Sequence, residues 1–295
     1  MEVVLVCTGN FQSYILQNIQ QLKNLQNHQI TVITESEFFD YFPKDIRLVD
    51  RKTLVNEQIN NYLQNTQHSR DFRGGFWIHC FTRFLYIYQY MKNEDRKNII
   101  HLENDVMTYF KMDEEFLQRF NVEKDMYIIL DNPSRCIPGL IFIRSYHIWE
   151  KLFQHINYHN NDMDWLSGMF RLYPQHIDYL PIIHLPLKTN DIEWNHQYES
   201  KWNCIFDAAA MGQYLGGVDP RNISGDTVGF VNTDASFPYN GYRFQWQFEN
   251  DLWVPYLVDG DKKIKIMNLH IHSKNLDRFL SSNQEPFTHH LLQKS

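Results

Sequence analysis

The sequence predicts a mixed α/β fold in which a mostly parallel sheet is flanked by helices. Apolar segments of strand length recur early in the chain, at residues 2–7, 30–34 and 46–50. The first is followed by a segment, 15–25, whose apolar residues recur at helical spacing. Strands that alternate with helices in this way are typical of a doubly wound sheet.

The later segments continue this pattern and then change character. Gly74 and Gly75 are expected to open a helix that runs to about Met91. Further strands are expected at 99–102, 126–130, 138–145 and 264–275, with helices at 148–156 and after Asp164. Periodicity fades from 174 to 256, but no linker appears, so we expect one domain, 1–295, with halves 1–110 and 111–295.

Composition narrows the functional classes. A content of 43% hydrophobic and 15% aromatic residues is that of a packed protein, and the net charge of -7 argues against a general nucleic-acid binder. The four cysteines are widely separated and form no C-x-x-C pair, so neither a disulfide framework nor a zinc knuckle is expected. The sequence contains no apolar segment long enough to span a membrane, and no signal peptide is recognised. A cytoplasmic location is therefore expected.

Two carboxylates follow the buried strand predicted at 99–102. Glu103 and Asp105 lie where the strand ends, which is the edge at which open α/β sheets bind ligands. Residues two apart on an extended segment point the same way, so both can reach one hard cation such as Mg²⁺ or Mn²⁺. The alternative is an ordinary polar turn, which we predict for the second copy of the tripeptide, Glu249–Asp251.

The expected strand at 264–275 carries the other candidate metal ligands. Strand alternation places His270 and His272 on one face, with Ser273 and Lys274 at the tip. The histidines can complete a metal site with the two acids if these distant segments meet, and a structural role is the alternative for each. Lys274 is then suited to neutralise a metal-bound diphosphate.

Two further groups are candidates for ligand contacts at the predicted sheet edge. Thr8, Gly9 and Asn10 lie at a helix start, where backbone amides can contact a nucleotide, although no G-x-G-x-x-G or Walker lysine loop is present. Asp50 ends the third strand and can bind a ribose or base, or cap the next helix. Arg73 can bind phosphate, or pair with a surface acid.

The second half offers an acidic pair and aromatic side chains. Asp162 and Asp164 precede the apolar Trp165, so one of them is expected to cap a helix while the other faces a cleft. A carboxylate beside a tryptophan suits a sugar ring. The tryptophans of the loop-rich part favour either carbohydrate recognition or packing under loops; they are Trp194, Trp202, Trp246 and Trp253. Small residues from Ala208 to Gly212 permit close backbone approach, and Gly216–Gly217 should end their helix.

Taken together, FRGGFW, HLEND, IPGLIFIRS, FDAAAMGQYLGGVDP and HIHSKN resemble metal-dependent glycosyltransferases of the GT-A fold, in particular small viral and bacterial ones. The resemblance covers the chain from Val3 to about Leu280. It implies a Rossmann-like sheet and a D-x-D-type metal motif at Glu103–Asp105, completed by a late histidine, His272 before His270. The first acid departs from the pattern because it is a glutamate.

The resemblance also implies an activity and roles for the remaining candidates. The enzyme would transfer a sugar from a UDP- or GDP-linked donor to a hydroxyl of a glycan or glycoprotein, with Mn²⁺ or Mg²⁺, in the host cytoplasm for a viral protein. Carried over by position, the nucleotide is held by Thr8 and Asp50, with Gly9 and Asn10 beside them; the donor sugar and phosphates are held by Arg73, Asp207, Gln213, Ser273 and Lys274. An inverting enzyme needs a base, Asp162 or Asp164, whereas in a retaining one both acids orient sugar hydroxyls.

Two other functions use the same features. A metal-dependent phosphoesterase can employ the same acids and histidines, although a two-metal site needs roughly five or six protein donors. An inactive, transferase-like carbohydrate-binding protein would rely on the tryptophan-rich half. Neither alternative requires a sugar nucleotide as donor.

Overall fold

A seven-stranded sheet forms the centre of the protein. The computed structural model describes residues 1–189, 192–217, 219–222, 239, 242–283 and 289–291. The strand order is β10-β6-β9-β4-β1-β2-β3, and only β9 runs antiparallel to its neighbours. Its strands are β1 (Glu2–Cys7), β2 (Ile30–Thr34), β3 (Arg47–Asp50), β4 (Lys97–Leu102), β6 (Met126–Ile128), β9 (Leu140–Ser145) and β10 (Ile177–Tyr179). The predicted mostly parallel sheet is therefore confirmed.

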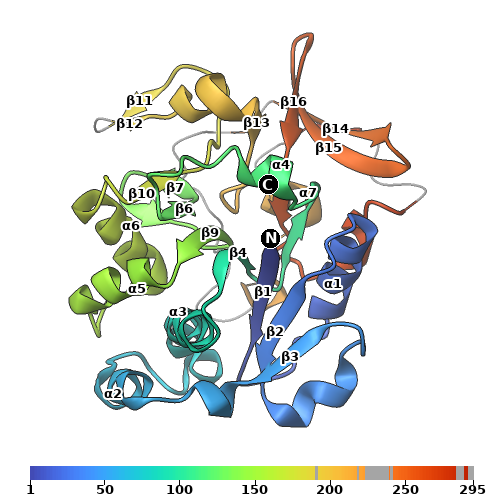
Figure 1. The fold of residues 1–295 in the computed structure, drawn as a ribbon. Helices are drawn as coiled ribbons and strands as arrows, with labels where there is room; N and C mark the ends of the chain where they lie inside the picture. Colours follow the sequence, from blue (N-terminus) through green and yellow to red (C-terminus); the bar gives the residue numbers. More distant parts are fainter. Residues whose placement is uncertain (190–191, 218, 223–238, 240–241, 284–288, 292–295) are drawn as a thin grey trace.

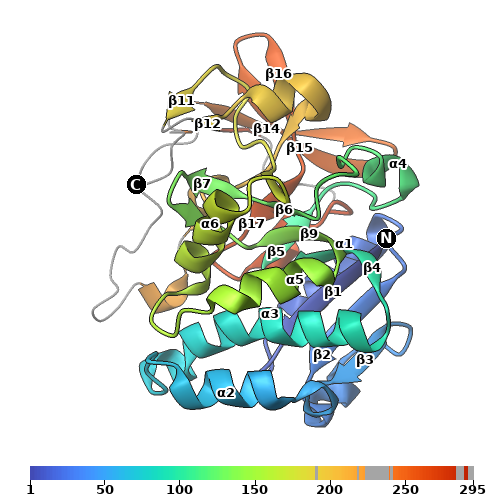
Figure 2. The ribbon, with the colours of Figure 1, turned by 60° about the vertical axis from the view of Figure 1, so that its left-hand side comes forward.

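Helices cover both faces of this sheet, so the residues of its inner strands are mostly buried. All five residues of β2 are buried, and Val3, Val4 and Leu5 of β1 have no exposed surface. Figures 1 and 2 show α1 on one face and α3, α5 and α6 on the other, with α2 beside α3. These helices are α1 (Ile15–Asn24), α2 (Glu57–Asn65), α3 (Phe76–Asn93), α5 (His147–Leu152) and α6 (Asp162–Leu172).

The order of the strands reverses at one point near the centre of the sheet. From β1 the chain proceeds outward to β2 and β3 and then returns to the other side of β1 as β4. The strand order therefore reverses between β1 and β4. Open α/β sheets bind ligands outside the carboxyl ends of the strands at such a reversal. In this chain the ends of these two strands are Cys7 and Leu102, directly before Thr8 and Glu103.

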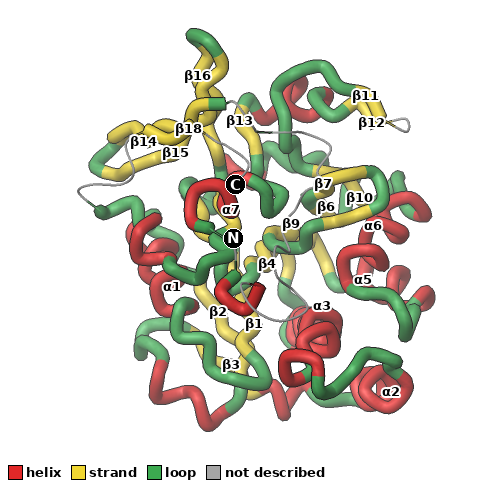
Figure 3. The backbone as a smooth tube through the Cα atoms, turned by 180° about the vertical axis from the view of Figure 1, so that it is seen from behind, coloured by secondary structure: helices red, strands yellow, loops and turns green. Residues whose placement is uncertain are grey.

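A second, five-stranded sheet lies at the opposite end of the molecule from β3 and α2 (Figures 1 and 3). Its order is β13 (Cys204–Ile205), β16 (Lys262–Ile266), β15 (Leu252–Asp259), β14 (Arg243–Glu249) and β18 (His289–Leu291). Asn250 and Asp251 link β14 to β15 with φ of 49° and 64°, as a tight hairpin turn requires. The turn predicted for the second tripeptide is confirmed.

The tryptophans of this region serve mainly as core. Trp194, Trp202 and Trp246 are buried, and Trp202 packs edge-on against Phe116 and Phe120. Packing under loops therefore explains these three. The other alternative, a carbohydrate-binding surface, does not apply to them because their rings are buried.

The segment predicted as one strand at 264–275 is divided, so that prediction was also wrong. Met267 separates β16 from β17 (Asn268–His270) because the chain changes its pairing partner at that point. β17 leaves the second sheet and pairs antiparallel with β5 (Val106–Thr108), placing His270 opposite Val106. His272 lies in the turn beyond the strand. The late segment thereby meets the end of the Glu103–Asp105 motif.

The remaining elements are short. They are α4 (Glu114–Leu117), β7 (Leu130–Asn132), β8 (Arg135–Cys136), β11 (Lys188–Thr189), β12 (Ile192–Glu193) and α7 (Met211–Gly216). Helix α7 ends as predicted, since Gly217 has a φ of 85°. Within the described residues, none of the helices is both long enough and apolar enough to span a bilayer.

Candidate functional site

The first two ligands of the candidate metal centre are fixed by the residue between them. The side-chain amide of Asn104 donates to the carbonyl of Val6 at 2.9 Å, at the end of β1. From α1, Asn18 donates to the carbonyls of Glu103 and Asn104, both at 3.2 Å. These bonds anchor the turn to β1 and α1, and the carboxylates of Glu103 and Asp105 are left to face His270.

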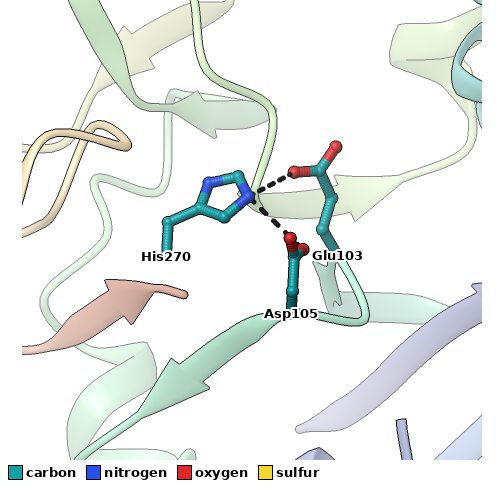
Figure 4. A group of neighbouring side chains, drawn as sticks. All are labelled: Glu103, Asp105 and His270. Carbon is teal, nitrogen blue, oxygen red and sulfur yellow. Dashed lines mark ion pairs between the residues drawn. The ribbon is translucent and has the colours of Figure 1, made fainter. Parts of the chain in front are cut away.

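His270 joins the two acids at the end of β4. Its Nε2 lies 3.2 Å from Oε2 of Glu103 and 3.3 Å from Oδ1 of Asp105. Figure 4 shows the imidazole between the two carboxylates. One donor atom from each of the three residues lies within 4.8 Å of the other two. Adjacent ligands of an octahedral ion bound at ~2.1 Å are ~3 Å apart, so this donor set fits Mg²⁺ or Mn²⁺.

Asp207 holds the His270 strand against α7. One oxygen of its carboxylate accepts from the amides of Ala210 and Met211, both at 2.8 Å, and the other accepts from Gly212 at 2.9 Å and His270 at 3.0 Å. The side chain is buried. Four backbone amides therefore occupy both oxygens, and the structure places Asp207 beneath α7 instead of among groups open to a donor sugar.

Glycine at position 212 is required for this contact. A Cβ built there would lie 1.9 Å from the carbonyl oxygen of His270, far closer than any real contact. The close backbone approach that the sequence predicted for Ala208–Gly212 thus occurs, and it occurs at the candidate metal ligand.

His272 is next to the centre but outside its group of three. Its ring packs edge-on against that of His270, with centroids 4.6 Å apart. Burial, together with the neighbouring His270 and Lys274, lowers the pKa of His272 to about 3, so its imidazole is neutral. His272 lies beyond β17, which ends at His270, and the group of three contains His270. His270 is therefore the better candidate ligand, the reverse of the predicted order of the two histidines.

Arg83, on α3, connects the centre to a third acid. Its guanidinium forms ion pairs with Glu103 and, at 2.5 Å, with Oδ2 of Asp162. Burial alone would raise the pKa of Glu103, but Arg83 and then His270 outweigh it and the pKa is lowered. The pKa of Asp105 is held well below its usual range because Lys274 and His270 outweigh burial. Both carboxyl groups are therefore ionised, as ligands of a cation must be.

Sequence reasoning missed Arg83, although a signal was present. It is the one charged residue between Phe76 and Met91, a helical segment otherwise rich in aromatic and aliphatic side chains. A charge on a buried helix face needs a partner of opposite sign. The partners could not be read from the sequence because Glu103 and Asp162 belong to other elements.

The two acids near the start of α6 have different surroundings. Asn161 is the capping residue, since its side chain accepts from the amide of Asp164 at 2.8 Å, so the prediction of an acidic cap was wrong. Asp162 in the first turn is buried against Arg83, whereas Asp164 is exposed. Trp165 packs in the core against Phe81 and is not available to stack on a sugar.

Burial gives Asp162 a measurable pH signature. Its pKa is raised to about 6, mainly by burial and further by Glu103, against the opposing effect of Arg83. Between about pH 4 and 6 the folded state holds a proton that the unfolded chain has released, so the unfolding free energy falls as pH rises. In the native protein, we expect the unfolding free energy to fall by on the order of 2 kcal/mol from pH 4 to 6 because of this group. In Asp162→Asn this fall should be absent, as measured by urea unfolding.

The exposed Asp164 supplies the control for this measurement. Asp164→Asn should leave the pH dependence of the unfolding free energy as it is in the native protein. An Asp162→Asn protein whose pH dependence matches that of the native chain would show that the carboxyl does not titrate in this range.

The amino-terminal candidates lie next to the end of β1, beside the strand-order reversal. Thr8 Oγ1 is 3.4 Å from Nδ1 of His79, and the amide of Gly9 donates to Glu35 at 2.9 Å. A Cβ at Gly9 would lie 2.6 Å from the His79 ring, and the φ of Gly9 is 87°, so glycine is needed on both counts. Asn10 is exposed.

Asp50 takes the alternative role that the sequence left open. Its carboxylate accepts from the amide of Lys52 at 2.9 Å and caps the short helix that follows β3.

The other candidates are spread around the centre. Arg73 donates to the carbonyl of Arg221 at 3.3 Å, which brings the helix opening near the chain that follows α7. Ser273 accepts from the amide of Asn275 at 3.4 Å in the turn after β17, and Gln213 donates to the carbonyl of Ala209 at 2.5 Å. The structure thus groups Glu103, Asp105, His270, Lys274 and Asp162 by direct ion pairs or through Arg83.

Comparisons with known proteins gave structural likenesses only. No protein-family model and no curated protein sequence matches the chain. Mouse xyloside xylosyltransferase 1 aligns over 61% of this chain and 84% of its own, with 12% identity and a TM-score of 0.43. A glycosyltransferase involved in glycosylation of the major capsid of PBCV-1 aligns over 61% and 81%, with 10% identity and a TM-score of 0.35.

Enzymes of another class show a comparable likeness. A cytidylyltransferase from Leptospira borgpetersenii aligns over 69% of this chain and 85% of its own, with 10% identity and a TM-score of 0.37. Likenesses at this level carry no argument about activity, which must come from the site.

Proposed function

We propose that this chain is a metal-dependent glycosyltransferase. It transfers a sugar from a UDP- or GDP-linked donor to a hydroxyl group of a glycan or glycoprotein, with Mn²⁺ or Mg²⁺. The observation that carries the proposal is the placement of Glu103, Asp105 and His270 beside Lys274 at the strand-order reversal between β1 and β4. A divalent-cation site and an ammonium group at such a reversal suit a nucleoside diphosphate.

The roles of the residues follow from their contacts. The bound cation would offset negative charge on the departing diphosphate. Glu103 and Asp105 present ionised oxygens, and His270 presents Nε2. Arg83 keeps Glu103 in place. In the proposed division of labour, residues 1–110 bind the nucleotide at Thr8 and Gly9, and residues 111–295 supply the histidine and the acceptor side.

Asp162 is the better candidate of the two acids for a role near the sugar. It belongs to the network of Arg83 and Glu103, whereas Asp164 is exposed. A pKa of about 6 allows its carboxylate to accept a proton close to neutral pH, as an inverting reaction requires. In a retaining reaction the same group orients a sugar hydroxyl.

The phosphoesterase alternative fits the centre less well. Among the described residues, the group of three formed by Glu103, Asp105 and His270 is the one cluster of metal-ligating side chains. Two-metal hydrolases hold their ions about 3.5–4 Å apart and need donors for both. Hydrolysis of a model phosphodiester in the absence of any sugar nucleotide would favour this alternative.

Thermal unfolding with nucleotides tests the proposal. We expect UDP or GDP to raise the melting temperature when Mn²⁺ is present and to have a much smaller effect in EDTA. A ligand at a hundred times its dissociation constant adds about 2.7 kcal/mol to the unfolding free energy. Absence of a shift with every nucleoside diphosphate would contradict the proposal. If a shift is seen, nucleotide release from a panel of sugar-nucleotide donors would identify the sugar.

A further inference from the structure

Lys274 is bound to the carboxylate that the proposed metal needs. Its Nζ forms an ion pair with Oδ2 of Asp105, while Oδ1 of Asp105 faces His270 Nε2 at 3.3 Å. Both oxygens of this carboxylate are therefore in use without a metal. An ammonium and a divalent cation on one carboxylate repel each other strongly in a partly buried site, because like charges a few ångströms apart are poorly screened there.

A second carboxylate lies within reach of the same ammonium group. Oδ2 of Asp219 is 4.0 Å from Nζ of Lys274. Asp219 is held firmly by Arg221, whose backbone amide donates at 2.8 Å and whose guanidinium donates to both carboxylate oxygens at 2.7–3.2 Å. The carboxylate is nearly buried, so it is a fixed acceptor close to Lys274.

The backbone of Lys274 is held in a turn. The residue has a φ of 63°, in the left-handed region, and its amide donates to the carbonyl of Ile271 at 3.1 Å. The Tyr14 ring lies 5.6 Å from Nζ and lines the ammonium position as a cation–π partner. The lysine side chain is flexible, and the 4.0 Å between Nζ and Oδ2 of Asp219 is short enough for rotation about its bonds to bring the two groups together.

We propose that Lys274 competes with the divalent cation for Asp105, and that Asp219 receives the ammonium when the cation binds. The inference rests on the proposed function, because it takes Glu103, Asp105 and His270 as the metal ligands. Lys274 then neutralises Asp105 in the metal-free protein and moves to Asp219 on metal binding. Asp219 acts through Lys274 and is a positioning residue, and Arg221 fixes Asp219.

Binding of Mn²⁺ alone, without nucleotide, tests this competition. The free ion is followed by electron paramagnetic resonance, with calorimetry as a second measurement. Lys274→Met removes the competitor and should tighten Mn²⁺ binding by roughly tenfold, the size of coupling found between charged neighbours. Asp219→Asn leaves the displaced ammonium without its second acceptor and should weaken binding by roughly three- to tenfold.

The double variant separates positioning from a structural effect. If Asp219 acts through Lys274, Asp219→Asn should have no further effect on Mn²⁺ affinity in a Lys274→Met background. A persistent effect there would overturn the role of Asp219. Lys274→Gln provides a second removal of the charge should the methionine variant fail to fold, and thermal unfolding in EDTA checks each protein.

The outcomes also distinguish this inference from the proposed function. A lysine that serves only to bind phosphate leaves Mn²⁺ affinity unchanged when it is replaced, so unchanged or weaker binding by the Lys274 variants overturns the competition alone. Failure of the native protein and every variant to bind Mn²⁺ overturns both the competition and the metal-dependent function.

Discussion

Asp105→Asn should abolish the Mn²⁺-dependent stabilisation by UDP or GDP and reduce sugar transfer by about a hundredfold or more. The substitution keeps the shape of the side chain and removes its negative charge. Asp105 contributes an oxygen that faces His270 and another that binds Lys274. A neutral amide binds a hard divalent cation more weakly than a carboxylate does, and its NH₂ group cannot accept from Lys274.

The second tripeptide offers a matched control. Asp251→Asn makes the same chemical change within the same Glu-Asn-Asp sequence, but in the β14–β15 hairpin. Asparagine also tolerates the φ of 64° found there. This variant should retain the Mn²⁺-dependent shift and the transfer rate. An Asp105→Asn protein that keeps the metal-dependent shift would place the metal elsewhere.

Gly212→Ala should lower the unfolding free energy by about 3 kcal/mol or more, an effect at the upper end of those caused by overpacking. The new methyl group would meet the backbone of His270, which cannot rotate away as a side chain can. Either α7 or β17 must move. Because β17 carries His270, we also expect weaker Mn²⁺ binding in the fraction that remains folded.

Gly168→Ala is the matched control for helix propensity. Gly168 lies within α6, and a Cβ at that position meets nothing closer than an Arg171 nitrogen at 4.0 Å. Alanine should stabilise the helix there by up to about 1 kcal/mol. Urea unfolding of both variants measures the difference. A loss at position 212 no larger than the change at 168 would contradict the close approach of α7 to β17.

The sequence predicted six of the seven central strands because they are short apolar segments, but it missed β10 (Ile177–Tyr179), which lies where the periodicity fades. The Glu103–Asp105 motif was found for the same reason, since two acids directly after a buried strand are conspicuous. Its repeat at Glu249–Asp251 was separated correctly, because the residues before it alternate as in an exposed hairpin strand. Local pattern was sufficient for these features.

The contacts that complete the site could not be predicted from local pattern, because they join segments that are far apart in the sequence. Alternation of apolar and polar residues favoured a continuous strand from Ile264 to Asn275. In the structure, the chain pairs with β15 before Met267 and with β5 after it. This exchange puts His270 at the acids and His272 in a turn. Asp207 was likewise expected near the donor sugar, and only the folded backbone shows four amides converging on its carboxylate.

The pairing of β17 with β5 has a consequence for how the protein becomes active. Lys274 and Asp105 are 169 positions apart in the chain, and joining such distant segments carries a large entropic cost that is recovered only once both are ordered. We therefore expect the proposed cation site to mature late in folding. On the ribosome, the early sheet strands can be complete while the nascent chain still lacks its histidine ligand, so metal binding would report that synthesis has passed β17.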